Sequence, residues 1–179
     1  MLTQEENDLL TRVGPGTPMG DLMREYWLPA FMSSELPEPD GPPLRIRLLG
    51  ESLLATRTSS GKIGLMSHTC PHRGASLFYG RNEQEGIRCV YHGWKFDASG
   101  RCIEQPAEPA GSTFMDKVRV KAYPVEVLGG LVWAYLGPSP ASLLPRWDLF
   151  MWDNVLRDVG TTLLPCNWLQ CMENSLDPI

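Results

Sequence analysis

Two short segments of this sequence each place one cysteine close to one histidine. Cys70 and His72 form a Cys-x-His pair, and Cys89 and His92 form a Cys-x-x-His pair. Thiolates and imidazoles are soft or borderline ligands that select zinc, copper, iron and iron–sulfur clusters. Four such side chains within residues 70–92 therefore predict a metal site.

Each pair contains one cysteine and one histidine, and this combination helps to distinguish a zinc site from an iron–sulfur site. Structural zinc sites commonly take close Cys pairs or close His pairs, although a single zinc ion could also accept this Cys₂His₂ set. A Rieske [2Fe–2S] centre instead needs two cysteines on one iron and two histidines on the other. Two loops that each supply one cysteine and one histidine meet that need. The alternative without metal is that these residues are core cysteines and buried histidines.

The residues around the two pairs suit close approach to a cofactor. Gly74 and Gly93 follow the two histidines, and glycine lets the backbone come near a ligand. Trp94 is expected to shield the site, to pack in the core, or to do both. His68 lies off the pattern and is interpreted as a turn residue. The other three cysteines are interpreted as small, half-buried apolar residues: Cys102, Cys166 and Cys171.

Charge and hydropathy exclude several classes of protein. The net charge of −5 argues against a general nucleic-acid-binding role. Residues 73–101 are the exception, with five basic and three acidic side chains. This window is interpreted either as a solvated loop surface or as a docking face for an acidic partner.

The sequence also predicts a location. The longest apolar run, residues 127–137, is too short to span a bilayer and is broken by Gly129 and Gly130. The N-terminal segment has no basic and no apolar region of the secretory type. The odd number of cysteines, five, argues against a disulfide framework. We therefore expect a cytoplasmic protein without a membrane partner.

Hydrophobic alternation predicts a mainly β chain. Thr17 and Pro18 have the residue types that begin a helix, and a proline-rich connector follows it up to residue 43. Short strands with turn signals between them then predict an antiparallel unit. The predicted strands cover residues 44–49, 52–57, 62–66, 118–122, 124–128 and 131–136, with a hairpin turn at 97–100 and another at Gly129-Gly130. The predicted organisation is 1–43 helix and connector, 44–137 metal-binding domain, and 138–179 linker and a helical start of a further domain.

The motifs resemble those of a known family. "CPHRG" and "CVYHGWKFD" resemble the Rieske motif of ring-hydroxylating oxygenases. Respiratory Rieske centres carry an extra cysteine in each loop, and none is present here, so the oxygenase or ferredoxin subtype is expected, with a potential in the lower part of the Rieske range. "GPGTPMGDLMREYWLPA" and "SSELPEPD" resemble the phthalate dioxygenase-like branch of the oxygenase α subunits.

The segment "NWLQCMENSLDPI" is similar to the helix that opens the catalytic domain of those α subunits. Asn167, Trp168, Glu173 and Asp177 match the family pattern, which continues with two iron-binding histidines and a carboxylate. The resemblance implies a mononuclear Fe(II) site that is completed only in a full-length protein. It also implies that Asp177 bridges the Rieske centre of one subunit to the iron of its neighbour. The alternative is that Asp177 only ends a helix before a proline.

Taken together, the resemblance implies a Rieske [2Fe–2S] antiparallel β-sandwich with a short N-terminal helix and the helical start of an incomplete catalytic domain. Cys70, His72, Cys89 and His92 would hold the cluster. The domain would take electrons from an NAD(P)H-dependent reductase or a ferredoxin and pass them to the mononuclear iron, within a homotrimer in the full-length form. The alternatives are a stand-alone Rieske-type ferredoxin and a structural Cys₂His₂ zinc module.

Overall fold

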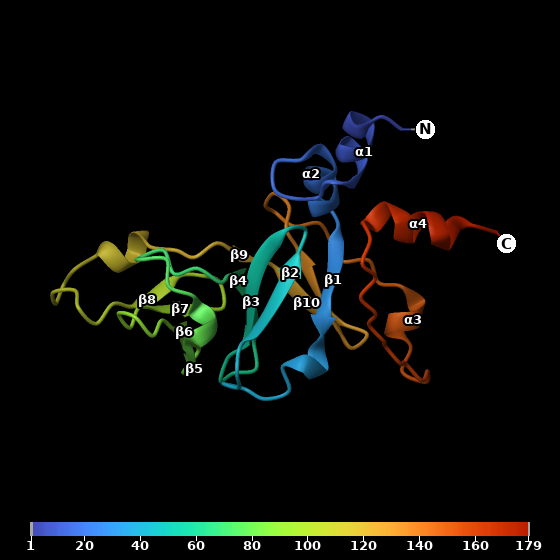
Figure 1. The fold of residues 1–179 in the computed structure, drawn as a ribbon. Coiled ribbons are helices and arrows are strands. Elements are labelled where there is room, and N and C mark those ends of the chain that lie inside the picture. Colours follow the sequence, from blue (N-terminus) through green and yellow to red (C-terminus); the bar gives the residue numbers. More distant parts are fainter. Residues whose placement is uncertain (1, 179) are drawn as a thin grey trace.

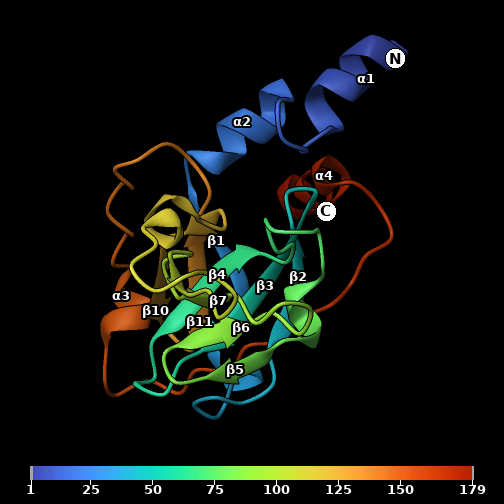
Figure 2. The same ribbon diagram turned by 90° about the vertical axis from the view of Figure 1, so that its left-hand side faces the viewer.

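Three antiparallel sheets carry the fold of residues 2–178, the part of the chain that the computed structural model describes (Figures 1 and 2). The first sheet has the order β1 (Trp27–Met32), β11 (Leu131–Tyr135), β10 (Val125–Leu128). The second has the order β2 (Leu44–Leu48), β3 (Glu51–Arg57), β4 (Ile63–Ser67), β9 (Ala122–Tyr123). The third has the order β5 (Arg81–Glu83), β6 (Gly86–Arg88), β7 (Lys95–Asp97), β8 (Cys102–Glu104). The prediction of a mainly β fold is confirmed.

The second sheet separates two hydrophobic cores. Its strands β2, β3 and β4 form the predicted meander. Leu53 and Ala55 on β3 face a core shared with the first sheet, whereas Leu54 on the same strand and Met66 on β4 face a core shared with the third sheet. Because β3 is covered on both faces, its four consecutive residues 53–56 are all buried, and three of them are apolar.

The third sheet is built from strands of three residues and extends from the body of the molecule (Figure 1). Such short strands are marginal alone and need a hydrophobic face to be stable. The core beneath the sheet supplies that face, and two of the predicted metal ligands belong to it. Its buried members are Leu54, Met66, Cys70, Leu77, Ile87, Cys89, Trp94, Phe96, Cys102, Val118 and Val120.

The helices lie outside the sheets. Thr17 caps α2 (Pro18–Arg24) with Pro18 as its first residue, which confirms the predicted helix start. Helix α1 (Gln4–Thr11) precedes it, α3 (Asp148–Met151) follows β11, and Asn167 caps α4 (Trp168–Leu176), where helical character was expected. In the described part of the chain, three 3₁₀ turns complete the elements: η1 (Ser33–Glu35), η2 (Leu77–Tyr79) and η3 (Phe114–Lys117). Within residues 2–178 no helix has the length and apolar character needed to cross a membrane.

Two segments differ from the predicted strands. Strand β1 lies where the sequence indicated helix and connector, and its partner β11 is about a hundred residues away in the chain. The segment 118–122 forms a ladder only at Ala122, on β9, together with an isolated bridge between Arg119 and Arg101. Its alternation arises because Val118 and Val120 are buried in the core of the third sheet.

A buried ion pair joins α2 to the second sheet. The Arg24 guanidinium donates to Glu51 Oε1 at 3.1 Å and to the backbone oxygens of Gly20 and Leu49 at 2.8 and 2.9 Å. The Tyr123 hydroxyl donates to Glu51 Oε2 at 2.6 Å. Burial disfavours the charged carboxylate, but the hydrogen bonds from Tyr123, Arg24 and Lys121 outweigh it and lower the pKa of Glu51.

Replacing Glu51 by glutamine is expected to lower the free energy of unfolding by about 3 kcal/mol at neutral pH, because it leaves the Arg24 charge unpaired in a buried site. The wild-type advantage should be complete above about pH 4.3, the unfolded pKa of a glutamate. This advantage should fall as the pH drops through the lowered pKa of Glu51 in the folded protein. Thermal unfolding of the wild type and of Glu51→Gln between pH 3.5 and pH 7.5 measures the difference in their free energies of unfolding. Acid sensitivity that the two proteins share does not contribute to that difference.

Glu126 supplies the matched control for that measurement. Its carboxylate lies 3.5 Å from Arg146, and the side chains of Arg146 and Glu126 are 59% and 41% exposed. Glu126→Gln should therefore change the free energy of unfolding by less than about 1 kcal/mol. Equal effects of the two substitutions, or a Glu51→Gln deficit that grows toward low pH, would contradict the account.

Candidate metal centre

Two loops of the same backbone design carry the predicted ligands. The first, residues 70–75, follows β4, and the second, residues 89–94, joins β6 to β7. In the first loop the Cys70 N–H donates to Ala75 O at 2.9 Å and the Gly74 N–H donates to Cys70 O at 3.0 Å. The second loop repeats both bonds, from Cys89 N–H to Trp94 O at 2.8 Å and from Gly93 N–H to Cys89 O at 3.0 Å.

This repetition explains the unequal spacing of the two motifs. Each loop has its glycine four residues after the cysteine, with φ of +74° at Gly74 and +75° at Gly93. The histidine is the third residue of the first loop but the fourth of the second. The loops therefore match in length, and His92 simply sits one position further along than His72.

Alanine at either glycine is expected to strain the left-handed backbone by about 1–2 kcal/mol. Gly74→Ala adds only that strain, since the new Cβ meets nothing within 4 Å. Gly93→Ala should cost more, because its Cβ would also lie 3.2 Å from Pro106 Cγ. With about 2–4 °C of thermal midpoint per kcal/mol, the midpoint should fall in the order wild type, Gly74→Ala, Gly93→Ala. A Gly93→Ala protein as stable as Gly74→Ala would contradict this.

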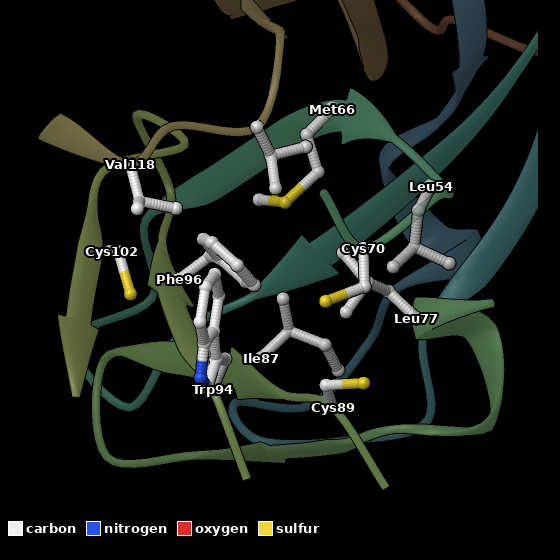
Figure 3. Close-up of a cluster of buried hydrophobic side chains, with 11 residues drawn as sticks. Leu54, Met66, Cys70, Leu77, Ile87, Cys89, Trp94, Phe96, Cys102 and Val118 are labelled. Atoms are coloured by element: carbon white, nitrogen blue, oxygen red, sulfur yellow. The ribbon is translucent and has the colours of Figure 1, made fainter. Parts of the chain in front are cut away.

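The two cysteines lie at the inner side of the site. Cys70 and Cys89 are 2% and 3% exposed, and both belong to the core of the third sheet. Figure 3 shows their sulfur atoms near Ile87, whereas the equally buried Cys102 lies apart from them beyond Phe96 and Trp94. The structure thus brings the two predicted thiol ligands together and leaves the third core cysteine away from them.

The two histidines form the outer side. The rings of His72 and His92 lie 4.5 Å apart between centroids, and His72 stacks on the indole of Trp94 at 4.4 Å with an interplanar angle of 7°. His92 is exposed, with its ring 3.9 Å from the ring of Tyr91. The Nδ1 atom of His72 is buried and has no hydrogen-bond partner. A buried polar atom without a partner calls for an explanation, and a bound metal is one.

The surroundings of these side chains shift the pKa of Cys70 and of His72. Burial, together with the neighbouring Cys89, raises the pKa of the Cys70 thiol to about 11, against the effect of the His72 and Arg73 backbone N–H groups. Burial and the nearby His92 and Arg73 lower the pKa of His72, which favours the neutral imidazole that a metal requires. Two thiolates at the inner position would need a cation for compensation.

The donor set fits a [2Fe–2S] cluster. One thiol pair lies inside, one imidazole pair lies outside, and the orphaned Nδ1 of His72 is available as a donor. Within residues 2–178 no three His, Cys, Asp or Glu side chains converge on one point as a single ion would require. A thiol pair and an imidazole pair are the donor set that the two irons of a Rieske cluster would require.

Other residues singled out in the sequence lie elsewhere. His68 is half-buried beside Ser76, with Nδ1 and Oγ 3.4 Å apart, and stays outside the ligand pairs. Asp177 is the C-cap of α4. Helix α4 lies on the opposite side of the molecule from the third sheet (Figure 1). The structure therefore does not bring Asp177 to the metal centre of its own chain. Cys166 is exposed rather than half-buried, with its Sγ 3.6 Å from that of Cys171.

The basic window of residues 73–101 is less basic at the surface than its composition suggests. The side chains of Lys95 and Arg88 are only 2% and 16% exposed, and both pair with Glu104. Sequence spacing gave no sign of this pairing, because Glu104 lies outside the window and meets the two cations only through the sheet. Both interpretations of the window, as a solvated loop surface and as a docking face, are wrong for these two residues.

Comparison with known proteins points to one family. The Rieske [2Fe-2S] domain family matches residues 26–124. The chain is 54% identical to the 5,5'-dehydrodivanillate O-demethylase oxygenase subunit of Sphingobium sp. (strain NBRC 103272 / SYK-6), with 100% of this chain and 42% of that protein covered. It is 46% identical to the phthalate 4,5-dioxygenase oxygenase subunit of Pseudomonas putida, with 99% and 40% covered. The chain thus spans about two fifths of the length of these relatives.

A solved structure supports the same fold. The oxygenase and ferredoxin complex of carbazole 1,9a-dioxygenase aligns with a TM-score of 0.59 and 31% sequence identity, over 68% of this chain and 31% of that chain. The resemblance to Rieske oxygenase subunits that the motifs indicated is confirmed by these similarities.

Proposed function

This chain belongs to the Rieske [2Fe-2S] domain family, and from that membership we propose that it is the electron-transfer domain of an aromatic-ring-hydroxylating or demethylating oxygenase. We assign Cys70 and Cys89 to one iron of the family's [2Fe–2S] cluster and His72 and His92 to the other. The observation that carries the assignment is a buried thiol pair beneath an outward-facing imidazole pair, with the Nδ1 atom of His72 buried and unpartnered.

The residues around the proposed cluster would have different roles. When bound, the cluster supplies reversible one-electron chemistry through its histidine-bound iron. The core of the third sheet keeps water from the thiolate side, and Trp94 holds the ring of His72 by stacking. Exposed His92 would be the point of electron entry and exit, since electron transfer slows steeply with distance. Val90 and Tyr91 beside it are 60% and 62% exposed and offer apolar contact area to a docking protein.

The electron donor in this proposal is an NAD(P)H-dependent reductase or a ferredoxin. The complex of an oxygenase with its ferredoxin among the structural neighbours supports a donor of this type. We place the protein in the cytoplasm, where pyridine nucleotides are reduced and thiol ligands stay reduced. Fractionation of the producing cells tests that location.

The electron acceptor in this proposal is a mononuclear Fe(II) held by two histidines and a carboxylate, which residues 1–179 do not supply. Asp177 would bridge the cluster of one subunit to the iron of the next, within a homotrimer. The position of α4 on the opposite side of the chain from the third sheet supports a bridge between subunits over one within a subunit (Figure 1). The similarity of this chain to oxygenase subunits over its full length supports an oxygenase role for the whole protein.

The test is an anaerobic redox titration of the chain. It should take up one electron, rapidly from NAD(P)H when a suitable reductase is present and slowly without it. Uptake of no electron would support the zinc module and overturn the proposal. A gene whose reading frame continues past residue 179 into two histidines and a carboxylate would support the oxygenase, whereas a stop codon there would support the stand-alone ferredoxin.

A further inference from the structure

Arg88 lies at the end of β6, next to the ligand Cys89, and its guanidinium makes three separate hydrogen bonds. Its Nη1 donates to Gly93 O in the second ligand loop at 2.9 Å. Its Nε donates to Glu83 Oε1 at 2.5 Å, and its Nη2 donates to Glu104 Oε2 at 2.5 Å. One side chain therefore ties the residue that follows His92 to two carboxylates outside the loop.

The two carboxylates fix the guanidinium from both sides. Glu83 lies on β5 and Glu104 on β8, the outer strands of the third sheet. Lys95 on β7 donates from Nζ to Glu104 Oε1 at 3.0 Å, and this lysine is almost fully buried. Glu83, Arg88, Lys95 and Glu104 thus link all four strands of the sheet, with one residue from each strand.

Such a network suits a positioning task. Arginine presents its donors in a rigid planar fork, so one guanidinium can hold three acceptors in a fixed arrangement, whereas a lysine offers a single flexible point charge. Some residues do not bind the metal themselves but hold its ligands in place by hydrogen bonds. Removing such a residue typically lowers metal affinity about 10–100-fold. The second loop lacks the covalent cross-link of respiratory Rieske centres, since residues 90 and 91 are Val and Tyr.

We propose that Arg88 is a positioning residue, which holds the second ligand loop closed through Gly93 O while Glu83 and Glu104 keep its guanidinium in place. This inference rests on the proposed function, because it assumes that the loop surrounds a cluster.

The experiment compares the cluster-loaded chain with its variants Arg88→Met, Arg88→Lys and Glu104→Gln. The rate of cluster loss to an iron chelator, followed by visible absorbance, should rise about 10–100-fold in Arg88→Met. It should rise at least about tenfold in Arg88→Lys, because one ammonium cannot span three acceptors. Glu104→Gln keeps the bond to Gly93 but weakens the anchor, so its rate should be intermediate. The EPR spectrum of the reduced Arg88 variants should also change, since the His92 ring loses its fixed orientation.

Arg81→Met is the matched control. Arg81 also pairs with Glu83, at 3.5 Å, but its side chain is 74% exposed and it lies on β5. Its removal should leave both the loss rate and the EPR spectrum at wild-type values. Circular dichroism checks the folding of each variant. If Arg88→Met does not fold, the loss rates and EPR spectra of Arg88→Lys and Glu104→Gln are compared with those of the wild type instead.

The outcomes separate this inference from the proposed function. A wild-type chain that binds no iron–sulfur cluster overturns the proposed function and the inference together. A wild-type chain with the cluster, and Arg88 variants with wild-type loss rates and EPR spectra, overturns the role of Arg88 alone. Full rescue by Arg88→Lys, or an equal effect of Arg81→Met, would likewise show that charge and not the fork geometry matters, against the inference.

Discussion

Replacing Cys70 by serine is expected to leave the protein folded but without its cluster, with iron and sulfide per chain reduced more than about tenfold. Iron–sulfur clusters are held by thiolates, and a serine hydroxyl is a harder ligand that stays protonated. The substitution changes one atom in a side chain that is 2% exposed, so packing is nearly preserved. Iron and acid-labile sulfide assays, together with visible absorbance, measure the effect.

Cys102→Ser is the matched control for this prediction. Cys102 is also 2% exposed and belongs to the same core, but its Sγ faces Glu104 O at 3.5 Å and lies apart from the two proposed thiol ligands (Figure 3). This variant should keep its full content of iron and sulfide. The assignment of the ligands fails if Cys70→Ser retains the cluster, or if Cys102→Ser loses it to the same extent.

Replacing His92 by cysteine is expected to lower the midpoint potential of the cluster by about 100 mV or more. An anionic thiolate stabilises the oxidised iron more than a neutral imidazole does, and clusters with four cysteines lie near −400 mV, against about −150 mV at the lower limit for Rieske centres. For a one-electron couple, a shift of 100 mV changes the reduction equilibrium about fifty-fold. A spectroscopic redox titration gives the value directly.

His68 provides the comparison, because it is the one histidine of the chain outside the two pairs. Its ring nitrogens lie near the hydroxyl groups of Ser76 and Thr69, and not near the proposed ligands. His68→Gln should therefore leave the potential unchanged. A potential that responds to His68→Gln and not to His92→Cys would remove His92 from the ligand set.

The candidate ligands could be predicted from the sequence because their chemistry is local. Cys70 and His72, like Cys89 and His92, each lie within a single loop, so residue type and spacing identify them without knowledge of the fold. The spacing of short strand-like segments with turn residues between them likewise predicted the meander of β2, β3 and β4, since each strand pairs with its neighbour in sequence.

Features that depend on distant pairing were not predicted. Strand β1 contains Pro29 and gains its stability from β11, far along the chain, so no local pattern marks it. The strands of the third sheet are too short to show alternation. The contacts of Arg88 with Glu83 and Glu104 exist only because the sheet brings its outer strands to either side of β6.

Alternation in residues 118–122 shows a different limit. The pattern correctly reported that Val118 and Val120 are buried, yet it predicted a regular strand where the backbone forms mainly single contacts, such as Val120 N–H to Gly100 O at 2.8 Å. Periodicity reports which side chains face the core, and the number of available partners decides whether a ladder forms.

The most direct test of the central claim, that a Cys pair and a His pair share two irons, is the EPR and ENDOR spectrum of the reduced protein, with iron and sulfide assays on the same sample. We predict two irons and two sulfides per chain, as the [2Fe-2S] family requires, and nitrogen couplings from two histidines that change when histidine is labelled with nitrogen-15. One zinc ion per chain, without sulfide and without a paramagnetic signal on reduction, would contradict the account.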